Sequence, residues 1–106
     1  MDEERGVYMI SVAAELASMH PQTLRVYEAR GLIAPQRSAK NTRLYSQRDV
    51  ERLRRIQQLT SEQGLNLAGV ETVLRMEERV ERMQAKLERL RRHAAELEAQ
   101  MARMGL

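Results

Sequence analysis

The chain has 106 residues, a formal net charge of +3 and 42% hydrophobic residues, which allows one small hydrophobic core. It has no cysteine, so thiolate metal sites and cysteine redox switches are excluded. Residues 1–5 are mainly acidic, and no apolar run approaches the roughly 20 residues of a membrane span. We therefore expect a cytoplasmic protein with no membrane partner.

Two short helices joined by a tight turn are predicted near the N-terminus. Ser11 is a good N-cap residue for a first helix at residues 12–18. Pro21 disfavours helix at the residue before it and suits the first position of a second helix, which Gly31 ends. Because only about three residues separate the two, this order predicts a helix-turn-helix whose second helix enters the DNA major groove.

The N-terminal residues of such a second helix reach base edges. Gln22, Thr23 and Arg25 are therefore the candidate readers, and the planar fork of Arg25 suits guanine. Leu24, one position away around the helix, should face the core. The alternative is that Arg25 is an ordinary solvated arginine.

A basic loop follows the second helix. Residues 32–45 are polar in the middle and extended in tendency at both ends, which predicts a two-stranded wing with its tip at residues 39–42. Arg37, Lys40 and Arg43 give it positive charge with no acidic residue, as expected of a loop that lies along phosphates. A solvated loop with incidental charge is the alternative. Residues 20–55 contain nine lysines and arginines but three acidic residues, so positive potential gathers here.

A third helix is predicted at residues 47–63, because Ser46 and Asp49 can form a capping box. Gly64 should end it, and Asn66 can cap the next helix, which begins near Leu67 and continues into a coiled coil.

Apolar residues then recur every seven positions for more than four heptads, a pattern typical of a coiled coil. The a positions are Val73, Val80, Leu87, Ala94 and Met101, and the d positions are Met76, Met83, Leu90, Leu97 and Met104. Four methionines on this seam are better explained as flexible packing groups than as a metal site. We expect dimerisation, since the core of one small chain is marginal. The seam leaves parallel and antiparallel pairing open.

The predicted fold is therefore mainly α: a winged helix-turn-helix domain at residues 1–72 and a coiled-coil dimerisation helix at residues 73–106. Several segments carry a resemblance that agrees with it. Residues 23–33, 43–46 and 49–50 resemble the DNA-binding domain of the MerR family of bacterial transcription regulators. Residues 19–25, 57–60 and 64–70 are similar to its heat-shock repressor branch, HspR.

The resemblance implies a homodimeric repressor on an inverted repeat upstream of chaperone operons, with antiparallel pairing and the chaperone DnaK as co-repressor. It also implies that Tyr27 touches phosphate, whereas Val26 replaces a second aromatic residue. The candidate DNA-binding residues are Ser11, His20, Gln22, Thr23, Arg25, Tyr27, Arg37, Lys40, Arg43 and Tyr45.

No nucleophile, phosphate-binding or paired-carboxylate motif stands out, so we expect neither an enzyme nor a cofactor. We also expect no folded effector domain after the coil, which favours regulation through a protein partner, and association with the nucleoid when DNA is bound. Two alternatives remain: a MerR-type activator that distorts promoter DNA, and a coiled-coil adaptor whose N-terminal part binds protein. Loss of binding as salt rises would separate DNA binding from the adaptor.

Overall fold

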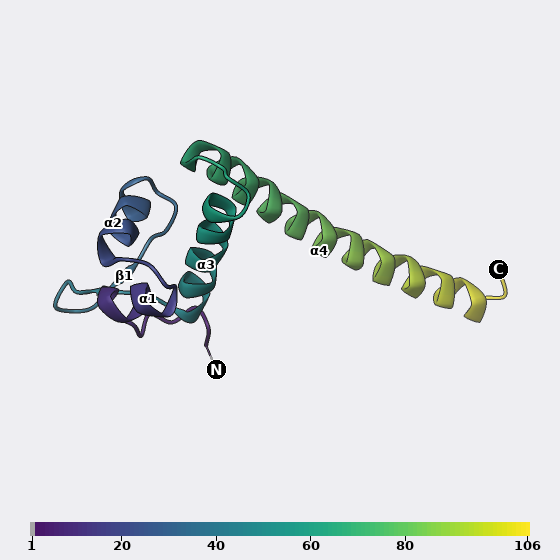
Figure 1. Cartoon of the computed structure of the whole chain (residues 1–106). Coiled ribbons are helices and arrows are strands. Elements are labelled where there is room, and N and C mark those ends of the chain that lie inside the picture. Colours follow the sequence, from purple (N-terminus) through teal and green to yellow (C-terminus); the bar gives the residue numbers. More distant parts are fainter. Residues whose placement is uncertain (1) are drawn as a thin grey trace. The chain divides into compact units, whose positions relative to one another are not determined.

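The computed structural model describes residues 2–106, which form four helices and two short strands (Figure 1). The chain divides into two units, one that runs to Val70 and one at Glu71–Leu106. The fold is mainly helical with a small wing and a long last helix, as predicted.

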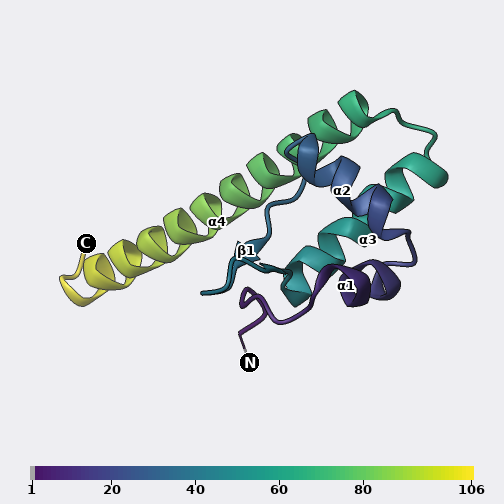
Figure 2. The same ribbon diagram turned by 90° about the vertical axis from the view of Figure 1, so that its left-hand side faces the viewer.

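The first unit, which we call the head, contains the helices α1 (Ile10–Leu16), α2 (Pro21–Ala29) and α3 (Gln47–Ser61). α1 packs against both α2 and α3 (Figure 2). The buried side chains of the head are Ala13, Ala14, Ala17, Leu24, Tyr27, Leu32, Ile33, Tyr45, Val50, Leu53, Ile56, Leu59 and Val70. They come from every helix and from the wing, so one core holds the whole head.

The first helix begins earlier than the sequence suggests. Met9, not Ser11, occupies its N-cap position, and Ser11 lies inside the first turn. The reason is a backbone bridge in which the Tyr8 amide donates to the Tyr45 carbonyl over 2.9 Å and the Tyr45 amide donates back over 2.7 Å. This bridge keeps the chain extended as far as Tyr8. The helix ends at Leu16, because Ser18 takes a left-handed conformation with φ of 56°.

The second helix begins at Pro21, and Gly31, with φ of 77°, follows its end, both as predicted. The wing pairs β1 (Gln36–Arg37) with β2 (Arg43–Leu44) in antiparallel register, with Arg37 opposite Arg43. The wing tip therefore lies between the two strands, where the sequence placed it.

Side-chain caps set the next two helix starts. The Ser46 hydroxyl accepts from the Asp49 amide over 3.0 Å, and the Asp49 carboxylate accepts from the Ser46 amide over 2.9 Å. This is the predicted capping box of α3, although the helix ends at Ser61, two residues early. The Asn66 side chain accepts from the Gly69 amide over 2.8 Å and caps the following helix, as expected.

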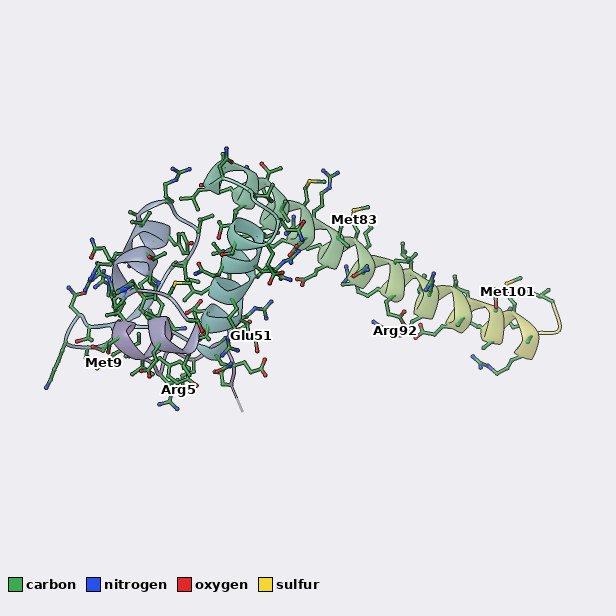
Figure 3. The ribbon with its side chains drawn as sticks, in the orientation of Figure 1. Arg5, Met9, Glu51, Met83, Arg92 and Met101 are labelled. Carbon is green, nitrogen blue, oxygen red and sulfur yellow. The ribbon has the colours of Figure 1, made fainter. Side chains whose placement is uncertain are left out.

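The last helix, α4 (Leu67–Arg103), is continuous from the head through the second unit (Figure 1). The predicted seam residue Met104 lies one position beyond its end. Large apolar seam side chains of the second unit are 45% to 68% exposed: Met76, Val80, Met83, Leu87, Leu90, Leu97, Met101 and Met104. Figure 3 shows Met83 and Met101 on one edge of the helix and Arg92 on the opposite edge. The described helices include none that is long and apolar enough to cross a bilayer.

Candidate nucleic-acid interface

The exposed side of α2 carries two of the three predicted readers. Leu24 and Tyr27 turn into the core, which leaves Gln22 and Arg25 exposed on the other side of the helix. The Arg25 guanidinium donates to the Gln22 side-chain oxygen over 3.1 Å, so the two form one polar surface. Thr23 is half-buried beside them. The core contacts thus fix which face of α2 is available to a ligand.

The wing tip is a compact turn held by Ser38. Its hydroxyl accepts from the amides of Lys40 over 3.3 Å and Thr42 over 3.1 Å. Asn41 adopts φ of 64°, the left-handed conformation that asparagine tolerates. Lys40 is exposed at the tip, and Arg37 is exposed at the end of β1 with one donor on the Asn41 carbonyl over 3.3 Å. The wing therefore presents two cations to solvent.

Arg43, the third predicted phosphate contact, is engaged within the head. Its Nε atom lies 2.9 Å from one Glu28 carboxylate oxygen and 3.2 Å from the other. This ion pair joins β2 to α2. The prediction that Arg43 contacts DNA rested on the wing sequence alone, in which Glu28, fifteen residues away, does not stand out as a partner.

The structure places two predicted contacts, Tyr27 and Tyr45, in the core of the head. Tyr27 is almost fully buried, and its hydroxyl donates to Gln57 of α3 over 3.2 Å. Tyr45 is fully buried, and among the described residues its hydroxyl has no hydrogen-bond partner. Burial raises the pKa of Tyr45, and the negative charge of Glu28 raises it further.

The remaining predicted contacts lie at the surface. Ser11 is exposed in the first turn of α1, and His20 is exposed at the N-cap position of α2, where its side chain makes no capping bond.

A hollow of about 230 Å³ separates the start of α1 from the wing. Its lining residues are Met9, Ile10, Arg37, Asn41, Thr42 and Arg43.

Two arginines of α3, which no sequence motif singles out, hold the interface in place. Arg54 donates from Nε and Nη2 to the Leu16 carbonyl at the end of α1, over 3.1 and 2.9 Å. Arg52 donates to the Leu32 carbonyl after α2 over 2.7 Å. Both contacts join residues far apart in sequence, so no local pattern indicates them. Both arginines add to the positive potential of the head.

The described residues include no group of three histidine, cysteine, aspartate or glutamate side chains that could hold a metal ion. A short helix, a turn, a second helix with an exposed polar face and a basic wing together define a winged helix-turn-helix of the DNA-binding class.

Residues 8–77 match the model of the MerR helix-turn-helix family of regulatory proteins, so the chain belongs to the MerR family. Over 90 residues it is 47% identical to HspR of Streptomyces coelicolor, which carries the name heat shock protein; the match covers 85% of this chain and 60% of that protein. It is 37% identical over 81 residues to the regulator GlnR of Bacillus cereus, with 74% and 62% covered. The chain thus spans about three fifths of the length of these relatives.

Two solved structures share the fold. The transcription regulator PbrR691 of Ralstonia metallidurans, in complex with lead(II), has a TM-score of 0.64 and 25% identity, covering 86% of this chain and 83% of that one. HiNmlR, a MerR family regulator that lacks the sensor domain and is bound to promoter DNA, has a TM-score of 0.61 and 23% identity, covering 89% and 77%.

Proposed function

We propose that this protein is a homodimeric repressor that binds an inverted-repeat operator of heat-shock and chaperone genes. The observation that carries the proposal is the exposed Gln22 and Arg25 pair on a helix whose other face is buried by Leu24 and Tyr27. A helix held in this way can enter the major groove without disturbing the core. The proposed role is binding, with no catalytic step.

In this proposal, Arg25 and Gln22 read base edges, and Thr23 lies beside them at the start of the helix. Arg37 and Lys40 contact phosphates, which orient the head but carry no sequence information. Ser11 and His20 lie at the starts of α1 and α2, where polar side chains that donate hydrogen bonds suit phosphate oxygens. The head thus supplies readers and phosphate contacts from separate elements.

Dimerisation is supported by the exposed seam of α4. Its leucines and methionines and Val80 repeat at heptad spacing and lie at the surface of a single chain, whereas Val73 is half-buried. Burial of such a stripe against a second copy is the usual coiled-coil solution. We adopt antiparallel pairing from the family resemblance. A two-fold dimer carries two equal heads, so its operator should be an inverted repeat.

The heat-shock role is supported by the 47% identity to HspR. We propose DnaK as the co-repressor on the same resemblance. The test is a mobility shift on the operator with and without purified DnaK. Tighter binding at saturating chaperone would support the co-repressor, and unchanged affinity would exclude it.

The first experiment measures binding to the protein's own upstream region and to a scrambled duplex across a salt series. Arg25→Ala should weaken binding to the operator by about 1 to 3 kcal/mol and leave the scrambled duplex nearly unaffected. Lys40→Ala is the matched control, because removal of a phosphate contact should weaken both duplexes about equally and flatten the salt dependence. An equal loss on both duplexes for Arg25→Ala would show that it is not a reader.

A further inference from the structure

The ion pair between Glu28 and Arg43 divides the wing cations into two kinds. Arg43 is half-exposed, with 37% of its side chain accessible, but Glu28 is only 17% accessible. Arg37 and Lys40 pair with no carboxylate among the described residues and remain exposed. Arg43 is therefore held by an ion pair to α2, whereas Arg37 and Lys40 are not.

Glu28 occupies the Nε donor of Arg43, so a phosphate could take that donor only by displacing Glu28. A carboxylate that has lost most of its water is costly without a cationic partner. It would also face the incoming phosphate as a like charge. Glu28 lies three residues after Arg25 on α2, so the pair connects the wing directly to the helix that carries the readers.

The other strand of the wing is held as well. The Gln36 side chain in β1 donates to the Glu4 carbonyl over 2.6 Å and accepts from the Gly6 amide over 2.8 Å. Gly6 approaches so closely that an added Cβ would lie 3.1 Å from the Leu44 carbonyl oxygen and 3.0 Å from its Cβ. Both strands of the wing are thus held by contacts to the rest of the head, and the tip at residues 38–42 extends from these two held strands.

We infer that Arg43 is a positioning residue, which Glu28 holds so that the wing keeps a fixed placement beside the recognition helix, and that Arg37 and Lys40 supply the wing's phosphate contacts. This inference rests on the proposed placement of the wing on DNA phosphates. The slope of log affinity against log salt distinguishes the two roles, because only the removal of a cation from a phosphate lowers it.

The test uses the full chain and its operator, with affinity measured at several salt concentrations. Lys40→Gln should reduce the slope by about 0.9 for each phosphate that the lysine no longer neutralises, and twice that in a homodimer. Arg43→Gln and Glu28→Gln should each weaken operator binding about tenfold, the scale of a close charge pair, and leave the slope at its wild-type value. The double variant should be no weaker than either single variant, since both remove the same ion pair.

Two outcomes would overturn the inference: a slope for Arg43→Gln that falls as it does for Lys40→Gln, or tighter binding by Glu28→Gln because Arg43 has been released to the DNA. The charge swap Glu28→Arg with Arg43→Glu separates placement from folding. It should recover most of the affinity that each single reversal loses, and failure of this rescue in a folded protein would also count against the inference. A wild-type protein that shows no salt-dependent binding would instead refute the proposed function.

Discussion

The head and the second unit of α4 use the same apolar residue types in opposite ways. In the head, Leu53 is completely buried, whereas Leu90 of α4 is 55% exposed. The head has its own core within one chain, because contacts between residues distant in sequence enclose side chains such as Leu24, Val50 and Leu53. The seam of α4 has a regular pattern but nothing of the second unit covers it.

Local interactions contribute little to the stability of the exposed part of α4. A surface ion pair between Glu88 and Arg92, 3.7 Å apart at spacing i,i+4, contributes only about 0.3 to 0.5 kcal/mol. Most helical stability in proteins comes from packing an apolar face. The contrast therefore teaches that the head gains stability from tertiary contacts within one chain, and that the exposed seam of α4 gains the same stabilisation only where a partner covers it.

Negative charge introduced into the seam of α4 should have the largest effect of these changes, because it should prevent dimerisation. Leu87→Glu with Leu90→Glu would place four carboxylates in the dimer seam, which we expect to cost on the order of 5 kcal/mol or more and to abolish the dimer. Sedimentation should then report a monomer at every tested concentration. The matched control is Ala85→Glu with Ala99→Glu, which adds the same charge on the opposite face of the heptads. A dimer that survives the seam variant, or dissociates equally in the control, would contradict the comparison.

A pair of leucine truncations would sharpen the comparison. Leu53→Ala removes a fully buried side chain of the head and should lower its free energy of unfolding by about 2 to 5 kcal/mol at any protein concentration. Leu97→Ala should lower stability only where the dimer forms, because Leu97 is 45% exposed in one chain. Urea unfolding at two protein concentrations a hundredfold apart measures both. A concentration-dependent loss for Leu53→Ala would argue that the head is not self-contained.

The capping box of α3 should give a smaller effect, confined to the head. Ser46→Ala removes the acceptor of the Asp49 amide and should cost about 1 kcal/mol in head stability, with the dimer dissociation constant unchanged. Ser46→Thr is the control, since it keeps the hydroxyl. A change in dimer dissociation with Ser46→Ala would mean that the two units are coupled.

The features that the sequence predicted correctly depend on neighbouring residues. Pro21, Gly31 and the Ser46 capping box act within a few positions of themselves, and the heptads of α4 are a repeat along one helix. The exposure of Gln22 and Arg25 was also predictable from nearby residues, since Leu24 on the same helix faces the core and leaves the opposite face of α2 to solvent.

The features that the sequence did not indicate share a different cause, contact between residues far apart. Ser11 failed as a cap because the Tyr8 and Tyr45 backbones pair across the head and begin α1 early. Arg43 was assigned to phosphate because nothing in the wing's own sequence points to Glu28. Tyr45 was assigned to DNA by motif, although its neighbours in the fold bury it.

Replacement of Tyr45 should change the stability of the head least. Its buried hydroxyl has no partner among the described residues, so Tyr45→Phe should be neutral or stabilise the head by up to about 1 kcal/mol near neutral pH. Because burial raises the pKa of Tyr45 in the folded state, the unfolded chain loses its phenolic proton first, and stability should fall as the pH rises above about 10. Thermal unfolding from pH 7 to 11 should show a shallower alkaline loss in Tyr45→Phe than in wild type. Parallel curves would mean that Tyr45 does not supply this pH dependence, and a clear loss at neutral pH would mean that its hydroxyl has a partner after all.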